Sequence, residues 1–262
     1  MKKLIYIALA ITVSSLYAQE PLNAIVEYTR VINNPTGVSF GTPYRLYCNT
    51  GSSFYERVGI AQRVIEKTEE KLGPNGEMTE DRIMKSSLPY DYYYTDIESN
   101  TLVFREAIVG KLFVVQDVIE PINWSLHAEN KMIDKYNCQK ATATYRGREY
   151  TVWFTSEIPI SHGPWKLRGL PGLILEMTEE TGKYEFHVSK INLKPDNKDI
   201  KDKLKIPNTK EIVKMDVYVK ALKNIAKDEK ALMLASMPRG AKLLEGCDEC
   251  PDPNNRSLER FE

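Results

Sequence analysis

The sequence lacks net charge, and none of its apolar runs is long enough to cross a membrane. Its 36 Lys and Arg residues balance 36 Asp and Glu residues, so no basic surface is predicted for nucleic acid or for an anionic membrane. The chain also has no H-E-x-x-H, P-loop or G-x-G-x-x-G motif, the signatures of several metalloproteases and nucleotide-binding proteins. From these patterns we expect no catalytic residue, no cofactor, no nucleic-acid partner and no transmembrane segment.

The first eighteen residues have the order of a secretory signal. Two lysines are followed by an apolar run over 4–13, two serines and the small residue Ala18, which precedes Gln19. The run is shorter than the ~20 apolar residues that span a bilayer. We expect residues 1–18 to be removed and the protein to be exported, as a periplasmic or outer-membrane-associated protein. Removing two lysines and no acid leaves 34 basic against 36 acidic residues.

Cysteine is scarce, with four in the whole chain. An even number in an exported protein favours disulfides, and of the three possible connectivities we favour Cys48–Cys138 with Cys247–Cys250. The second pair is also a weak candidate for a metal or redox site, because two thiolates can bind soft metals. Asp248 and Glu249 stand between the two cysteines in the sequence, and their negative charge disfavours the reactive thiolate.

Short segments rich in β-branched and aromatic residues, separated by turn residues, dominate the chain. Gly110-Lys111 and Arg146-Gly147 read as hairpin turns between neighbouring strands. This pattern predicts a mainly β (α+β) fold, an antiparallel meander or half-barrel sheet in a single domain over 19–262. The predicted strands are 24–32, 44–48, 90–94, 102–109, 112–118, 124–128, 136–145, 149–155, 173–178 and 184–191.

One long C-terminal helix is predicted over 209–235. Asn208 and Glu211 have capping-box spacing, and apolar residues follow at helical period. This helix belongs to a charged linker-and-helix region at 194–240, and a cysteine-containing tail follows at 241–262. A second segment, 58–72, reads either as a helix or as a solvated insertion.

Two further patterns concern which face of a strand a residue occupies. The tyrosines at 90 and 92–94 line a binding groove in one reading and lie on both faces of an edge strand in the other. Strict alternation along 136–145 places Tyr136 and Cys138 on one face and Ala141 and Ala143 on the other.

The most informative segment is the loop 157–172, in which proline and glycine alternate with apolar residues. Proline fixes φ and glycine permits positive φ, so such a loop has few accessible conformations. We expect it to pack over the end of the sheet, with two tryptophans as anchors. The predicted binding and structural residues are Trp153, Glu157, His162, Gly163, Pro164, Trp165, Arg168, Gly169, Pro171 and Gly172.

Basic residues flank this loop and predict a rim that could hold a carboxylate or phosphate. Their alternatives are a solvated face or pairing with Glu149 and Glu157. A hydrolytic reading of the loop would need His162 and Glu157 within hydrogen-bond reach, about 3 Å. A rigid packed loop is the preferred reading. The basic residues are Arg146, Arg148, Lys166 and Arg168.

The same region contains a set of short motifs: Cys138-Gln-Lys140-Ala141-Thr, Arg146-Gly-Arg148, Trp153-Phe-Thr155, Glu157-Ile-Pro159-Ile, Gly163-Pro-Trp165-Lys166 and Gly169-Leu-Pro-Gly-Leu-Ile174. These resemble the signature of the GLPGLI family, exported proteins from Bacteroidota. The tail, with Leu258-Glu259, is similar to the usual ending of that family. The resemblance is strong over 124–188. It implies an exported envelope protein and no established activity.

These observations predict an exported envelope protein that acts as a non-catalytic binding module. Its partner would be another envelope protein, a peptide or a small apolar ligand, and the specificity element would be the loop 157–172 with its flanking arginines. The alternative is an uncharacterised periplasmic enzyme, such as a hydrolase, or a C-x-x-C metal or redox protein.

Overall fold

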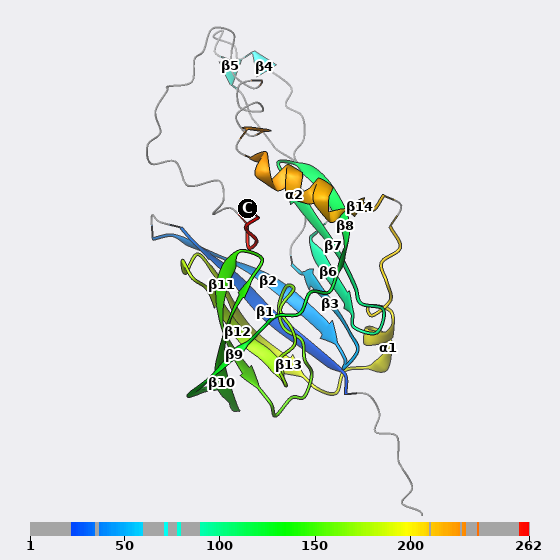
Figure 1. Cartoon of the computed structure of the whole chain (residues 1–262). Coiled ribbons are helices and arrows are strands. Elements are labelled where there is room, and N and C mark those ends of the chain that lie inside the picture. Colours follow the sequence, from blue (N-terminus) through cyan, green and yellow to red (C-terminus); the bar gives the residue numbers. More distant parts are fainter. Residues whose placement is uncertain are drawn as a thin grey trace, which may run out of the picture.

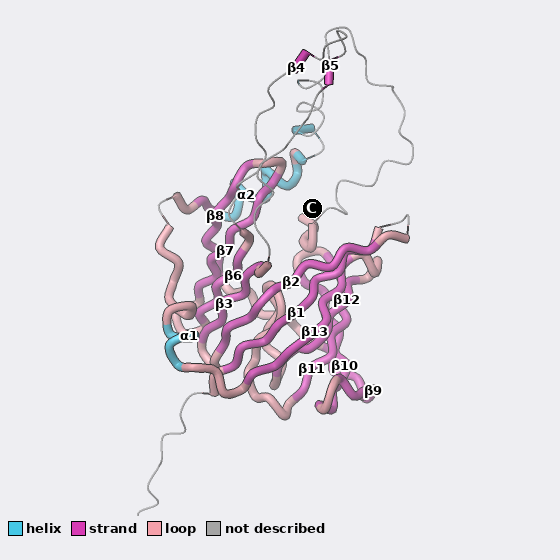
Figure 2. The backbone as a smooth tube through the Cα atoms, turned by 180° about the vertical axis from the view of Figure 1, so that it is seen from behind, coloured by secondary structure: helices cyan, strands magenta, loops and turns pink. Residues whose placement is uncertain are grey.

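The computed structural model describes residues 22–34, 37–59, 71–72, 78–79, 90–209, 211–225, 227–228, 235 and 257–261. Its main feature is one curved twelve-stranded sheet, which confirms the mainly β prediction (Figures 1 and 2). The order from edge to edge is β14-β8-β7-β6-β3-β2-β1-β13-β12-β11-β10-β9. These strands are β1 (Ala24–Asn33), β2 (Ser39–Cys48), β3 (Ser52–Arg57), β6 (Tyr92–Asp96), β7 (Thr101–Ile108), β8 (Lys111–Val118), β9 (Ser125–Ile133), β10 (Tyr136–Tyr145), β11 (Arg148–Thr155), β12 (Leu173–Glu179), β13 (Tyr184–Asn192) and β14 (Val213–Lys214).

Three smaller features accompany the sheet in the described part of the chain. β4 (Lys71–Leu72) pairs with β5 (Met78–Thr79) as a separate two-stranded ladder. The helices are α1 (Asn197–Lys201) and α2 (Met215–Lys223).

Two antiparallel runs of strands make up the large sheet. β1 joins them by pairing with β13, from Ile25 opposite Asn192 to Ile32 opposite Tyr184. β8 and β9 are consecutive in sequence but lie at or near opposite edges, and only residues 119–124 connect them. Such a connection reaches at most about 25 Å, so the sheet must curl until its edges approach each other. β14 pairs in parallel with β8, so the sheet is mixed.

Tight turns with positive φ form two of the predicted hairpins. φ is 48° at Val109 and 73° at Gly110, and 49° at Arg146 and 73° at Gly147. Positive φ at both turn residues is the geometry that matches the twist of the flanking strands. The first turn therefore lies one residue earlier than the predicted Gly110-Lys111, and the second lies where it is predicted.

A single large apolar cluster fills the inner face of the sheet, where strand residues meet the loop between β11 and β12, Tyr218 of α2 and Leu258. Tyr93 belongs to this cluster, whereas Tyr92 and Tyr94 pack with Val103 in a second cluster. The tyrosines of β6 therefore alternate between the two faces. β6 lies between β3 and β7, so the prediction of an edge strand is wrong.

The long helix predicted over 209–235 is wrong in its described part. α2 begins at Met215 with Lys214 as its N-cap, so Asn208 and Glu211 do not cap it. β14 precedes the helix and extends along β8, because pairing with an existing strand overrides a local helical preference. Most of 58–72 lies outside the described residues, and Lys71–Leu72 at its end is a strand rather than a helix.

The cysteine and signal predictions meet the structure only in part. Cys48 and Cys138 are buried free thiols, so the predicted bond between them is not formed. Cys247, Cys250 and the signal segment 1–18 lie outside the described residues, so the disulfide between these cysteines and the signal segment stay predictions. None of the described helices has both the length and the apolar character needed to cross a bilayer.

Candidate functional site

The loop between β11 and β12 lies inside the molecule. Ile158, Ile160, Leu167 and Leu170 are each at most 2% exposed. Backbone hydrogen bonds tie the loop to β12, including one from Leu173 N to the Ile158 carbonyl oxygen at 3.0 Å. The predicted packing of this segment onto the sheet is therefore confirmed, and the loop forms part of the core instead of an open binding surface.

Gly172 closes the loop where two backbones meet. A Cβ atom at this position would lie 2.0 Å from the carbonyl oxygen of Thr155. No side chain fits at that separation, so the close approach requires glycine. The contact fixes the end of the loop against the end of β11.

Trp165 is the main apolar anchor of the loop. Its ring packs against Tyr145, with ring centroids 6.1 Å apart, and against Tyr150 at 5.8 Å. Its φ is 60°, a conformation that costs a non-glycine residue on the order of 1–3 kcal/mol. Packing on two tyrosines holds this backbone in place, and the next residue, Lys166, is 1% exposed.

The other loop residues have different surroundings. Trp153, the second predicted anchor, is half-buried and lies under the ammonium of Lys131, which is 4.6 Å from its ring centroid. Gly163 and Pro164 are buried. Gly169, with φ of 90°, and Pro171 are exposed.

The predicted basic rim is instead a set of buried or bridging cations. The Arg148 guanidinium lies 3.1 Å from Glu179, and both side chains are fully buried. Arg168 donates to the carbonyl oxygens of Lys166 and Glu120, at 2.6 and 2.7 Å. Arg168 therefore fastens the loop to the connection between β8 and β9.

Arg146 bridges the two ends of the curled sheet from the β10–β11 turn. Its guanidinium lies 2.7 Å from Asp117 near the end of β8 and 3.1 Å from Glu120. The Arg146 and Asp117 side chains are less than a tenth exposed. An ion pair thus joins strands that share no backbone hydrogen bond in the order of the sheet.

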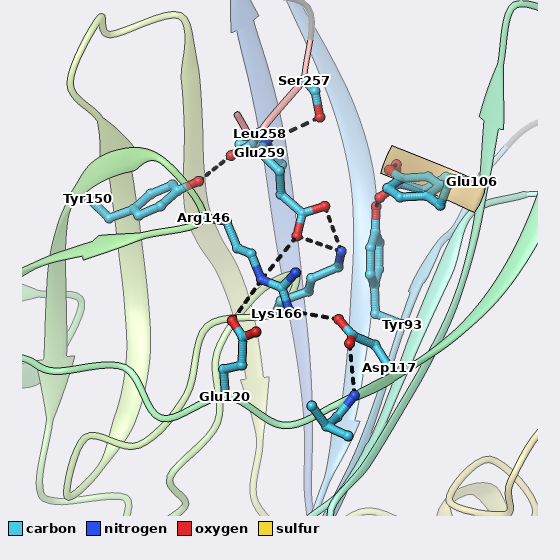
Figure 3. A network of polar contacts seen from close by, with 12 residues as sticks. Tyr93, Glu106, Asp117, Glu120, Arg146, Tyr150, Lys166, Ser257, Leu258 and Glu259 are labelled. Atoms are coloured by element: carbon cyan, nitrogen blue, oxygen red, sulfur yellow. Dashed lines mark hydrogen bonds and ion pairs between the residues drawn. The ribbon is translucent and has the colours of Figure 1, made fainter. Parts of the chain in front are cut away.

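Lys166 and Glu259 form a buried ion pair between the loop and residues 257–261, here called the C-terminal segment (Figure 3). The Lys166 Nζ atom lies 2.8 Å from each carboxylate oxygen of Glu259. Nζ also lies 3.6 Å from the ring centroid of Phe104. Three more rings surround it at 5.5–5.9 Å, those of Trp165, Tyr218 and Tyr93. Among the described residues, the ammonium therefore pairs with one carboxylate, that of Glu259, and is otherwise surrounded by aromatic rings.

The main chain of the C-terminal segment is held on both sides of this carboxylate. The Tyr150 hydroxyl donates to the Leu258 carbonyl oxygen (Figure 3). Arg260 N donates to the Arg146 carbonyl oxygen at 2.8 Å. A Cβ atom at Gly147 would lie 2.2 Å from the carbonyl oxygen of Arg260. The β10–β11 turn therefore offers a bare backbone surface on which the segment lies.

The two carboxylates in this region have different partners. Burial raises the pKa of Glu259, and the charge of Lys166 opposes that shift. The carboxylate of Glu106 raises it further. Glu106 itself accepts hydrogen bonds from Tyr93, at 2.6 Å, and from Tyr218. A buried charge needs such partners to offset its loss of water.

The structure places His162 and Glu157 in different environments. His162 is 1% exposed, and its Nε2 atom has no hydrogen-bond partner among the described residues. Burial and the charge of Arg168 lower its pKa to about 4, so the ring is neutral at pH 7. Glu157 is exposed and accepts a hydrogen bond from Asn137 N at 2.8 Å. The hydrolytic reading gains no support from this arrangement.

Among the described residues, no three His, Cys, Asp or Glu side chains gather so that they could hold a metal ion. A small pocket lies between residues 222, 223 and 225, at and just after the end of α2, and the C-terminal segment.

Sequence reasoning identifies one half of the site. It selects Lys166 as a candidate anion binder, and the observed anion is Glu259 of the same chain. It assigns Tyr150 no role in the site, and it places Gly147 in a hairpin turn without predicting that a segment lies on it. The available signal was the similarity of Leu258-Glu259 to the ending of a known family, because a short ending that recurs at a distance from the core motif needs a place to bind.

Comparison with known proteins gives a partial family match and a distant fold match. A family model described as "Protein of unknown function (Porph_ging)" matches residues 146–176, which include the β10–β11 turn, β11 and the loop. No curated protein matches the chain. The structure of PNGF-II in a P21 crystal is similar, with a TM-score of 0.50, 15% identity, and coverage of 79% of this chain and 34% of that one. The structure of PNGF-II in a C2 crystal has a TM-score of 0.49 and 16% identity, and the match covers 79% of this chain and 33% of that one. The chain thus spans about a third of the PNGF-II chains, and at this identity the likeness concerns the fold alone.

Proposed function

We propose that this chain is an exported, non-catalytic binding module whose inner-face site takes an extended peptide segment. The observation that carries the proposal is the way in which the C-terminal segment is held. The Tyr150 hydroxyl donates to the Leu258 carbonyl oxygen, and Arg260 N donates to the Arg146 carbonyl oxygen. These contacts to the main chain of the segment combine with the buried pair of Lys166 and Glu259. Backbone contacts that supply affinity, together with a side-chain contact that supplies specificity, are the general mode of extended-peptide recognition.

Residues capable of chemistry are placed in a way that favours binding over catalysis. His162 is buried with a lowered pKa. Cys48 and Cys138 are buried thiols, and burial raises the pKa of both. A peptide also fits better than a small apolar ligand, because the inner face is already covered by the loop and its own apolar cluster.

Export is part of the proposal and rests on residues 1–18, with their charged start, apolar run and small residue before Gln19. N-terminal sequencing of the protein recovered from its native cells should begin at or near Gln19. An N-terminus at Met1 would remove this part of the proposal.

Peptide binding can be tested on the full-length chain. The Glu259→Gln substitution weakens the binding of the C-terminal segment to its own site. The variant should therefore bind a labelled peptide of residues 257–262 saturably and in a 1:1 ratio. Wild type should bind the peptide more weakly, because its tethered segment competes at an effective concentration on the order of millimolar. Glu98→Gln, at an exposed turn residue, is the matched control and should behave as wild type.

The readouts are fluorescence anisotropy for binding and mass spectrometry for the recovered peptide, whose mass should be unchanged. A lack of saturable binding to both the variant and wild type would overturn the binding proposal. Cleavage of the peptide would replace it with an enzymatic one.

A further inference from the structure

We infer that the site is selective for a glutamate side chain, so that its ligand is an acidic peptide of a partner protein and the chain's own C-terminal segment is the resident competitor. This inference rests on the proposed function and names the ligand class for the same site. Three features of the site carry it: the isolation of Lys166, the fixed main chain around Glu259, and the backbone approach at Gly147.

Charge selectivity follows from the surroundings of Lys166. Its side chain is fully buried, and its nitrogen faces aromatic rings on the sides that Glu259 does not occupy. A peptide with a neutral amide at this position would leave a buried ammonium without a counter-charge, which is strongly unfavourable. The site therefore discriminates between glutamate and glutamine by charge.

Length selectivity follows from the main chain. Leu258 is fixed through its carbonyl oxygen by Tyr150, and Arg260 is fixed through its N–H by the Arg146 carbonyl oxygen. The Cα atom between them therefore has little freedom to move toward Lys166. An aspartate carboxylate would end one methylene short, and the two 2.8 Å contacts would not both form.

The close approach at Gly147 means that the site also selects for the position of the ligand's main chain. The carbonyl oxygen of Arg260 occupies the place where any Cβ at position 147 would lie. A ligand therefore has to place a main-chain carbonyl group on the turn, as Arg260 does. This requirement excludes free phosphate or a folded acidic surface, which match the charge of Lys166 but have no main chain free to lie on the turn.

The source of the natural ligand follows from the competition. The C-terminal segment fills the site in the free chain, so a ligand must offer the same contacts in order to displace it. An acidic segment of a partner protein meets that condition. Exchange of segments between two copies of this chain would also meet it, and the experiment separates these sources.

The test uses full-length Glu259→Gln and labelled peptides of residues 257–262 with Glu, Gln or Asp at the position of Glu259. The Glu peptide should bind roughly tenfold or more tightly than the Gln and Asp peptides. Gly147→Ala added to this variant should reduce binding of all three peptides. If the three peptides bind equally well, the selectivity inference fails while the proposed function stands. If none binds, the proposed function fails.

A second measurement guards against loss of folding in the variant. In ¹⁵N-labelled wild type, excess unlabelled Glu peptide should move the amide signals of residues 258–261 to the positions of an unfolded segment, and the Gln peptide at the same concentration should not. Displacement by both peptides would contradict glutamate selectivity. Dimers of wild type that dissociate on addition of the Glu peptide would assign the site to a second copy and overturn the partner assignment.

Discussion

The Nζ atom of Lys166 lies 2.8 Å from each carboxylate oxygen of Glu259, a residue 93 positions later in the sequence. The two residues differ in one respect that matters for stability. Lys166 belongs to a loop that is part of the core, whereas Glu259 belongs to a short segment. Loss of one partner should therefore not have the same effect as loss of the other.

Glu259→Leu should lower the free energy of unfolding by about 3–5 kcal/mol, because the Lys166 ammonium remains buried without its counter-charge. Lys166→Met should lower the free energy of unfolding by less, because the C-terminal segment can leave its site and expose the Glu259 carboxylate to water. The double variant should recover part of the loss, since two apolar groups can face each other. Urea unfolding of the four proteins measures these values, and equal losses for the two single variants would contradict the asymmetry.

His162 should make stability depend on pH between about 4 and 6.5. Its pKa is lowered to about 4 in the folded chain from 6.5, so the unfolded chain binds the proton more readily in this window. The contribution is therefore fully present above pH 6.5 and is lost as the pH falls toward 4. The full effect is about 3 kcal/mol.

Thermal or urea unfolding at a series of pH values checks this prediction. His162→Gln should flatten the profile in the window from 6.5 to 4. The control is His187→Gln, because the His187 side chain is 42% exposed, and this variant should retain the wild-type slope. An unchanged slope in His162→Gln would show that other groups cause the dependence.

Gly172→Ala should destabilise the chain by about 3 kcal/mol or more, because the added methyl group would meet the Thr155 backbone, which cannot move aside as a flexible side chain can. Gly51→Ala is the matched control, since a Cβ there would approach Asn49 no closer than 3.8 Å. That change should cost about 1 kcal/mol or less. Chemical unfolding monitored by tryptophan fluorescence distinguishes the two.

Cys48 and Cys138 should be unreactive in the native protein. Both are buried, and burial raises the pKa of the Cys138 thiol to about 11 and that of Cys48 further. In a Cys247→Ser/Cys250→Ser background, a thiol reagent at pH 8 should label neither residue until denaturant is added. Denatured, non-reduced protein that still resists labelling would reveal a disulfide between them.

The strands of this fold were predictable where a hairpin turn marks them. Arg146-Gly147 supplies two positive φ values at a turn, and the flanking strands β10 and β11 match their predicted ranges within a residue. β3, by contrast, has no predicted counterpart. It pairs with β2 and β6, and β6 is more than thirty residues away in sequence. No local sequence pattern predicts a partner at that separation.

The faces of β10 show a second limit of local reasoning. Strict alternation separates Cys138 from Ala141, yet both are fully buried. The pairing of β10 with β9 shifts between Gln139 and Ala141, and such an irregularity breaks the period of two on which face predictions depend. The site has the same limit, because Lys166 was predictable as a charge whereas its partner depends on where a segment 93 positions away docks.

The central position of β1 affects how the chain must fold. Asn33 Nδ2, at the end of β1, donates to the Gly182 carbonyl oxygen 149 positions later. The strand that starts the sheet thus has an incomplete edge until β13 is available. Loop-closure entropy opposes contacts of such separation, and folding rates fall as they become more numerous. Independent hairpins should therefore form first and the union of β1 with β13 last. Until that step, the unpaired edge of β1 can form hydrogen bonds with strands of other molecules, which promotes aggregation.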